Sequence, residues 1–148
     1  MNLNGSVALV TGANRGLGAR LVTQLLEAGA AKVYATSRAP GAIAVDADPR
    51  VQALVLDVTD RASVTAAAAA APDVTVLVNN AGVLAFGSAL TGDLTAFERD
   101  LATNYLGTLR VTRAFAPALE RNAPAAIVNV LTLIALAPGR ADGRLQRI

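Results

Sequence analysis

The 148-residue chain contains no cysteine and no histidine. Without cysteine there is neither a disulfide nor a thiolate nucleophile, and without histidine there is no Ser-His-Asp triad and no imidazole ligand for a metal. We therefore expect no metal cofactor. Lysine occurs once, as Lys32, and the aromatic residues are two tyrosines and three phenylalanines. These absences leave hydroxyl, amide, carboxylate and guanidinium groups as the main chemical repertoire of the chain.

Charge and hydrophobicity exclude two further classes of partner. The net charge is +2, and the basic residues are scattered along the chain, whereas nucleic-acid-binding proteins cluster them on one face. Hydrophobic residues make up 53% of the chain, yet no run reaches the roughly 18 apolar residues of a membrane span. Residues 1–4 show neither the basic segment nor the apolar run of a signal peptide. We expect a cytoplasmic protein that binds neither nucleic acid nor membranes.

Short apolar, β-branched runs alternate with longer helical segments. The predicted strands cover residues 7–10, 32–36, 51–56, 74–78 and 127–131, and the predicted helices cover 17–28, 61–71 and 97–120. Such alternation predicts a parallel sheet with helices on both faces. The fold class is therefore α/β, a doubly wound sheet in one Rossmann-type domain over residues 1–138.

A glycine-rich segment joins the first predicted strand to the first predicted helix. It reads Thr11-Gly12-Ala13-Asn14-Arg15-Gly16-Leu17-Gly18. Gly12 would permit the tight turn, Gly16 would let the backbone approach a pyrophosphate, and Gly18 would let the helix pack close to the strand. The free N–H groups at the start of the helix would then hold the phosphate. This placement favours dinucleotide binding over a simple turn.

The spacing Gly-x-x-x-Gly-x-Gly, with the preceding threonine, resembles the glycine motif of the short-chain dehydrogenase/reductase family. Other segments resemble family motifs in the same order: Leu56-Asp57-Val58, Asn79-Asn80-Ala81-Gly82, Asn104-Tyr105-Leu106-Gly107 and Ile127-Val128-Asn129-Val130. The resemblance implies strand order 3-2-1-4-5, and hydride transfer between a nicotinamide dinucleotide and a small carbonyl or alcohol substrate. The cofactor contacts it implies are Gly12, Arg15, Gly16, Leu17, Gly18, Arg38, Asp57, Val58, Asn79, Ala81 and Gly82.

The end of the second predicted strand bears on the choice of cofactor. It reads Tyr34-Ala35-Thr36-Ser37-Arg38, without a carboxylate. In dinucleotide folds an acidic residue about 20 positions after the glycine loop binds the 2′-hydroxyl of NAD, whereas an arginine accommodates the 2′-phosphate of NADP. Arg38 and Arg15 would bracket such a phosphate through paired hydrogen bonds, unless both are solvated surface arginines. NADP(H) is favoured over NAD(H).

The catalytic set that the resemblance implies is present only in part. The family uses a tyrosine with a lysine four residues later, a serine and an asparagine; the asparagine matches Asn104 and the serine position holds Thr132. The two tyrosines, Tyr34 and Tyr105, are followed at that distance by an arginine and a leucine. Because no Tyr-x-x-x-Lys can be assembled, we expect this chain alone to be catalytically inactive.

Residues 139–148 read neither as a strand nor as an amphipathic helix. Codons for Leu145-Gln146-Arg147-Ile148 can be read one nucleotide later as Tyr-Ser-Ala and the start of a serine codon, and Tyr-Ser-Ala-Ser-Lys is a common form of the family motif. We interpret residues 139–148 as a frameshifted tail and the fold as C-terminally incomplete. The strand at 127–131 would then lie at a sheet edge, and the homo-oligomer interface of the family would be lost.

Three interpretations stay open. The chain is a truncated NADP(H)-dependent oxidoreductase, a non-enzymatic nucleotide-binding or regulatory protein, or a remnant that does not fold stably. Binding of NADPH would separate the second from the third. The sequence assigns no substrate, because the substrate pocket of the family is built mainly from segments after residue 138.

Overall fold

The computed structural model describes residues 2–39, 41, 43, 48–86, 88 and 90–131. Thr132 and the expected tail at 139–148 lie outside these residues. The described strands are β1 (Val7–Val10), β2 (Lys32–Ser37), β3 (Val51–Val55), β4 (Val76–Asn79) and β5 (Ala126–Asn129). They form one parallel sheet in the order β3-β2-β1-β4-β5, which confirms the predicted doubly wound topology.

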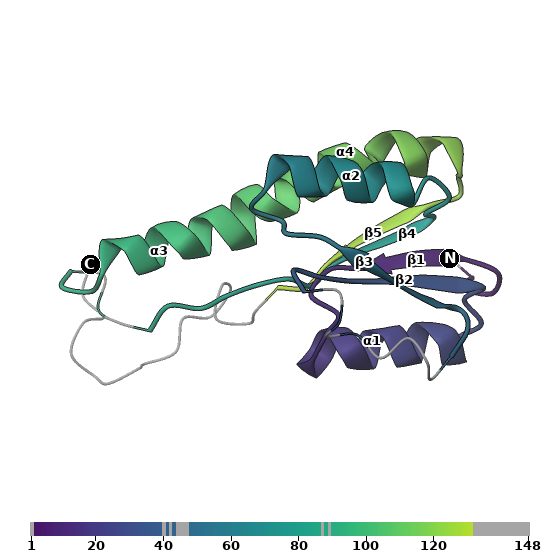
Figure 1. Cartoon of the computed structure of the whole chain (residues 1–148), viewed down its shortest axis with the longest axis horizontal. Coiled ribbons are helices and arrows are strands. Elements are labelled where there is room, and N and C mark those ends of the chain that lie inside the picture. Colours follow the sequence, from purple (N-terminus) through teal and green to yellow (C-terminus); the bar gives the residue numbers. More distant parts are fainter. Residues whose placement is uncertain are drawn as a thin grey trace.

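Helices cover both faces of the sheet (Figure 1). Helix α1 (Gly16–Glu27) lies on one face, and α2 (Arg61–Ala70) and α4 (Thr108–Arg121) lie side by side on the other. None of the helices in the described ranges combines the length and hydropathy that a membrane crossing requires.

The side chains of β1 show how the two layers of the core are divided. Successive residues of a strand point to opposite faces of the sheet. Ala8 and Val10 therefore join the cluster that contains Val22 of α1, whereas Leu9 joins the cluster that contains Phe115 of α4. All of these side chains except that of Val22 are fully buried. This core fixes β1 and β4 side by side, so that their carboxyl ends open at the same edge of the sheet.

The long helix expected over residues 97–120 is built differently from the prediction. It begins at Leu94, because the Asp93 carboxylate caps it by accepting a hydrogen bond from the Thr95 N–H at 3.0 Å. Helix α3 (Leu94–Asp100) is followed by a π-helical segment, η2 (Leu101–Gly107), and then directly by α4. Extended π-helical turns are rare and occur mostly at functional sites.

Strand β5 lies at one edge of the described sheet, as expected. The side chains of Ile127 and Val128 are 45% and 46% exposed, and that of Leu131 is 83% exposed. Along η2, Leu101 and Tyr105 are exposed as well. Apolar surface is therefore open to solvent on both the edge strand and the long helix.

Candidate functional site

A groove of about 540 Å³ opens at the carboxyl ends of the strands, where the chain leaves β1 in one direction and β4 in the other. In doubly wound sheets this reversal point is the usual place for a ligand. The predicted cofactor contacts that line the groove are Gly12, Arg15, Gly16, Leu17, Gly18, Arg38, Asp57, Val58, Ala81 and Gly82. One segment after each of β1, β2, β3 and β4 thus contributes to a single wall.

The glycine loop brings its backbone to the surface of the groove. Gly16 has φ = 56°, a left-handed conformation, and a Cβ added to it would meet no atom within 4 Å, so the space in front of it is open. Gly18 lies against the backbone of the same loop: an added Cβ would be far closer to the Gly12 carbonyl oxygen than van der Waals contact allows. The loop therefore packs tightly against itself at Gly18 and leaves open space at Gly16, which lines the groove.

The first turn of α1 presents unpaired donors to this space. The N-cap residue, Arg15, makes no side-chain hydrogen bond to the helix. The first N–H groups of a helix have no partner within the helix, and they carry the positive end of its dipole. With no side chain capping them, the N–H groups of α1 are available to an anion, and a pyrophosphate fits this arrangement.

Thr11 and Asn80 connect the loops that follow β1 and β4. The Thr11 hydroxyl accepts hydrogen bonds from the backbone N–H groups of Asn80 and Ala81, both at 2.9 Å. The Asn80 side-chain amide donates to the carbonyl oxygens of Thr11 at 2.9 Å and Gly12 at 3.2 Å. Four hydrogen bonds therefore fix the two sides of the groove to each other before any ligand is bound.

Asn79, which the family resemblance placed among the cofactor contacts, is absent from the lining of this groove. Its side-chain amide donates to Thr112 Oγ1 of α4 at 3.1 Å and to Asn129 Oδ1 of β5 at 2.9 Å. The side chain is only 5% exposed. In this structure Asn79 joins β4 to the neighbouring strand and helix.

Asp57 follows β3 and is the one acidic residue among the described residues that line the groove. It accepts hydrogen bonds from the Thr59 hydroxyl at 2.6 Å and from the Thr59 N–H at 2.8 Å. These bonds, together with the charge of Arg38, hold the pKa of Asp57 below its ordinary value of 3.8. Asp57 is therefore ionised at neutral pH and can accept a hydrogen bond from a ligand.

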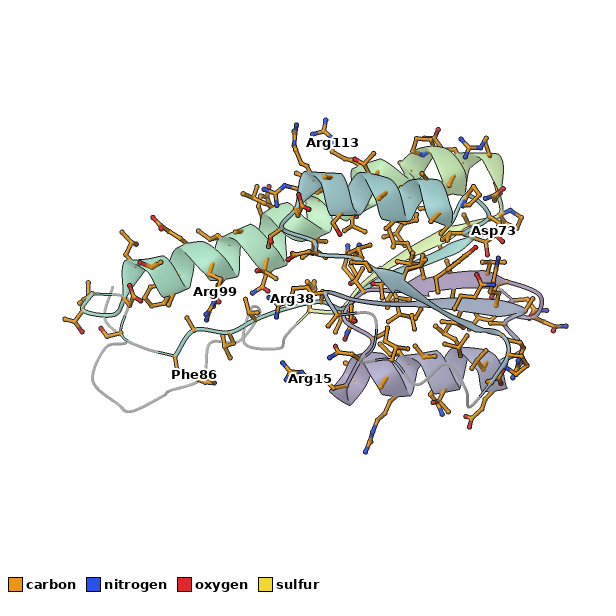
Figure 2. The ribbon with its side chains drawn as sticks, viewed as in Figure 1. Arg15, Arg38, Asp73, Phe86, Arg99 and Arg113 are labelled. Atoms are coloured by element: carbon orange, nitrogen blue, oxygen red, sulfur yellow. The ribbon has the colours of Figure 1, made fainter. Side chains whose placement is uncertain are left out.

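Three arginines from separate parts of the chain line the groove: Arg15 before α1, Arg38 after β2 and Arg99 in α3. Figure 2 shows Arg15 beside the start of α1, and Arg38 and Arg99 in the space between the sheet and α3. Among the described residues, the two ion pairs are Lys32–Asp73 and Arg50–Asp48, so none of these arginines is in one. The groove is therefore electropositive, with Asp57 as the carboxylate among its lining residues.

Asn104 lies in the middle of η2 and binds the segment that follows β4. Its side-chain amide donates to the Val83 carbonyl oxygen at 2.8 Å and accepts from the Val83 N–H at 2.9 Å. One turn earlier, the Asp100 carboxylate accepts from the Ala85 N–H at 2.6 Å. The donor and the acceptor of the Asn104 amide thus both hold Val83, and Asp100 holds Ala85, so that residues 83–85 are fixed to the long helix. Thr132, the other expected catalytic residue, lies outside the described residues.

Several residues that line the groove were not among the predicted cofactor contacts. They are Asn14, Ser37, Leu56, Thr59, Asn80, Val83, Arg99 and Thr103. Most adjoin a motif residue, so proximity in the sequence was the available signal. Arg99 has no such signal, because it reaches the groove only through the placement of the long helix.

No cluster of three or more potential metal-ligating side chains occurs in the part of the chain that the structure describes.

A family model of short chain dehydrogenases matches residues 6–141. The chain belongs to the short-chain dehydrogenase family.

Individual relatives agree with this assignment. A short chain dehydrogenase from Burkholderia cenocepacia, solved in complex with NADP, is 45% identical with a TM-score of 0.88, over 93% of this chain and 57% of that one. A 3-ketoacyl-(acyl-carrier-protein) reductase from Brucella melitensis, complexed with NADH, is 30% identical with a TM-score of 0.85, over 93% and 61%. The short chain dehydrogenase pigC of Monascus ruber is 35% identical over 90% of this chain and 50% of its own length. This short-chain dehydrogenase thus spans about half the length of the curated relatives it matches.

Proposed function

We propose that this chain binds NADP(H), in preference to NAD(H), in the groove at the carboxyl ends of its strands. The observation that carries the proposal is that Arg15 and Arg38 line the same groove as the glycine loop. The residues at the end of β2 include no carboxylate that would select a 2′-hydroxyl. Because the relatives include both an NADP and an NADH complex, the preference rests on the arginines of this chain.

Each part of the groove suits one part of the dinucleotide. The uncapped N–H groups of α1 would hold the pyrophosphate. The ionised carboxylate of Asp57 is an acceptor for an adenine amino group. Arg15 and Arg38 would pair with the 2′-phosphate through charge-assisted hydrogen bonds.

When bound, the nicotinamide group of the cofactor supplies the hydride chemistry of the family. In family members a tyrosine and a lysine four residues later handle the proton, and the 148 residues contain no such pair. Asn104 holds the backbone of Val83 with both functions of its amide. We infer that the activity of this chain alone is cofactor binding, and that carbonyl or alcohol chemistry requires a tyrosine and a lysine from outside these residues.

Titration of the purified chain with NADPH and NADH, followed by calorimetry, tests the cofactor preference. A charge-assisted hydrogen bond contributes about 1.5–3 kcal/mol, so Arg38→Asp is expected to weaken NADPH binding by roughly 10- to 100-fold. The affinity for NADH should change by less than about threefold, because NADH carries no 2′-phosphate for Arg38 to bind. Arg20→Asp makes the same charge change at an exposed residue of α1 outside the groove, and serves as the control. Equal losses for NADPH and NADH in Arg38→Asp would refute the assignment.

The absence of turnover is tested separately. The chain is mixed with NADPH and a panel of aldehydes and ketones, and the absorbance of NADPH is followed alongside a full-length short-chain dehydrogenase. We expect binding without oxidation of NADPH above the uncatalysed rate. Sustained, protein-dependent oxidation with any carbonyl compound would contradict the inference and would call for another proton donor among the 148 residues.

A further inference from the structure

Arg99 lines the cofactor groove without belonging to the glycine loop or to any of the segments that resemble family motifs. It comes from α3, whereas Arg15 follows β1 and Arg38 follows β2, so the three guanidinium groups reach the groove from two sides. Figure 2 shows Arg99 and Arg38 in the space between the sheet and α3. The cofactor contacts proposed above give Arg99 no role.

Arg99 lies on the face of the long helix that is turned toward the groove. Residues four apart on a helix are neighbours on one face, and Arg99, Thr103 and Gly107 have this spacing. Thr103 and Gly107 are both buried, and Thr103 lines the groove. An added Cβ at Gly107 would be 2.7 Å from Cγ2 of Val58, which lines the groove as well. Arg99 therefore continues an inward-facing row toward the mouth of the groove.

No contact among the described residues accounts for a guanidinium group at this position. Their two ion pairs do not include Arg99. The adjacent Asp100 carboxylate accepts from the Ala85 N–H at 2.6 Å. Arg99 is in the last turn of α3, where a cation can stabilise free carbonyl oxygens, but η2 follows directly and continues the helix. Helix stability therefore does not explain the residue.

The charge around the groove calls for an anion that is larger than a single carboxylate. Asp57 offsets part of the charge of the three arginines, and its carboxylate already accepts two hydrogen bonds from Thr59. A cleft lined mainly by one sign of charge concentrates its field on a ligand of the opposite sign. Phosphate groups of a nucleotide have this chemistry.

Of the phosphates in NADP(H), the 2′-phosphate suits Arg99 better than the pyrophosphate does. The pyrophosphate would be held by the uncapped N–H groups of α1. A phosphate monoester has three terminal oxygens, each a strong hydrogen-bond acceptor. Arg15 and Arg38 approach it from the strand side, and paired hydrogen bonds from two arginines leave acceptor positions free. Those positions would face the long helix, where Arg99 lies.

We propose that Arg99 is a specificity-determining residue that binds the 2′-phosphate of NADP(H) from the side of the long helix. The proposal rests on the proposed function, which places this phosphate between Arg15 and Arg38. Three guanidinium groups from three separate segments would then enclose the phosphate. Preference for NADP(H) over NAD(H) would depend on the position of α3 as well as on the loops after β1 and β2.

Calorimetric titration of an Arg99→Gln chain tests the proposal. Glutamine removes the charge and the guanidinium fork, so the affinity for NADPH should fall about tenfold and that for NADH by less than about threefold. Adenosine 2′,5′-bisphosphate should lose as much affinity as NADPH, and adenosine 5′-monophosphate should lose little, because the two differ by the 2′-phosphate. Arg99→Lys keeps the charge without the fork, and its affinity for NADPH should lie between those of Arg99→Gln and the unmodified chain.

Arg113→Gln is the matched control. Arg113 is an exposed arginine of α4 outside the groove, and Figure 2 shows its side chain pointing away from the sheet. This variant should bind both nucleotides as the unmodified chain does. Urea unfolding without ligand should give Arg99→Gln an unchanged midpoint. Equal losses of affinity for NADPH and NADH, or unchanged NADPH binding by a folded Arg99→Gln chain, would overturn the proposal.

Comparison with Arg38→Asp separates this proposal from the cofactor assignment on which it rests. A selective loss of NADPH binding in Arg38→Asp but not in Arg99→Gln leaves that assignment intact and removes the role of Arg99. A selective loss in Arg99→Gln but not in Arg38→Asp supports Arg99 and refutes the pairing of Arg38 with the phosphate. If the unmodified chain does not bind NADPH, or binds NADPH and NADH equally, both proposals fail.

Discussion

Replacing Thr11 with valine should loosen the connection between the two sides of the cofactor groove. Valine has nearly the shape of threonine but lacks the hydroxyl, so the N–H groups of Asn80 and Ala81 would lose their acceptor. Thr11 is 1% exposed, which leaves little room for water to replace the hydroxyl. At about 1–2 kcal/mol for each unsatisfied, partly buried N–H, the free energy of unfolding should fall by about 2–4 kcal/mol.

Thr11→Ser provides the matched control. Serine keeps the hydroxyl and removes one methyl group, which should cost only about 1 kcal/mol. The two variants are compared by urea unfolding followed by far-UV circular dichroism, and by NADPH titration, since Asn80 and Ala81 line the groove. If Thr11→Val is as stable as Thr11→Ser to within about 0.5 kcal/mol, the hydrogen bonds of the hydroxyl do not support the loop and the reasoning fails.

Two further predictions concern the groove. Gly18→Ala should lower the free energy of unfolding by about 1–3 kcal/mol and weaken NADPH binding, because its Cβ would collide with the Gly12 carbonyl oxygen. Urea unfolding should show no such loss for Gly41→Ala, whose Cβ would meet nothing within 4 Å. Asp57 has a lowered pKa in the folded chain, caused first by its hydrogen bonds from Thr59, so the stability it adds is present above its ordinary pKa of 3.8 and is lost as the pH falls through the lower folded value. Asp57→Asn should therefore flatten the acid side of a plot of urea midpoint against pH, and an unchanged slope below about pH 4 would count against this role.

Local sequence patterns were sufficient to predict the sheet. Each strand is a short apolar run, and the glycine loop follows the first strand directly, so the signal for each lies within a few neighbouring residues. The predicted ends differ from the structure by up to two residues in most elements, as at β4, which begins at Val76 rather than residue 74. Strand order and the position of the groove then followed from the family resemblance.

The π-helical segment could not be predicted from periodicity. An apolar stripe that fits 3.6 residues per turn changes little when a few turns widen, so residues 101–107 read as ordinary helix. Arg99 was missed for a related reason. It reaches the groove because tertiary packing places α3 there, and no local pattern encodes that position.

The orientation of Asn79 could have been derived from the alternation of β4. Val76 and Val78 belong to the cluster on the α1 face, and Leu77 belongs to the cluster on the α4 face. Asn79, two residues after Leu77, must point to the α4 face as well, where it meets Thr112. The family motif indicated that the segment matters, while the pleat of the strand determined which of its two asparagines faces the groove.

The long helix approaches the cofactor groove of this short-chain dehydrogenase along η2. Thr103 lines the groove, and one turn later an added Cβ at Gly107 would be 2.7 Å from Cγ2 of Val58, another lining residue. A side chain at position 107 would therefore require either Val58 or the helix to move. The spacing between η2 and the loop after β3 is thus set beside the groove, and a shift of η2 would alter the wall of the groove.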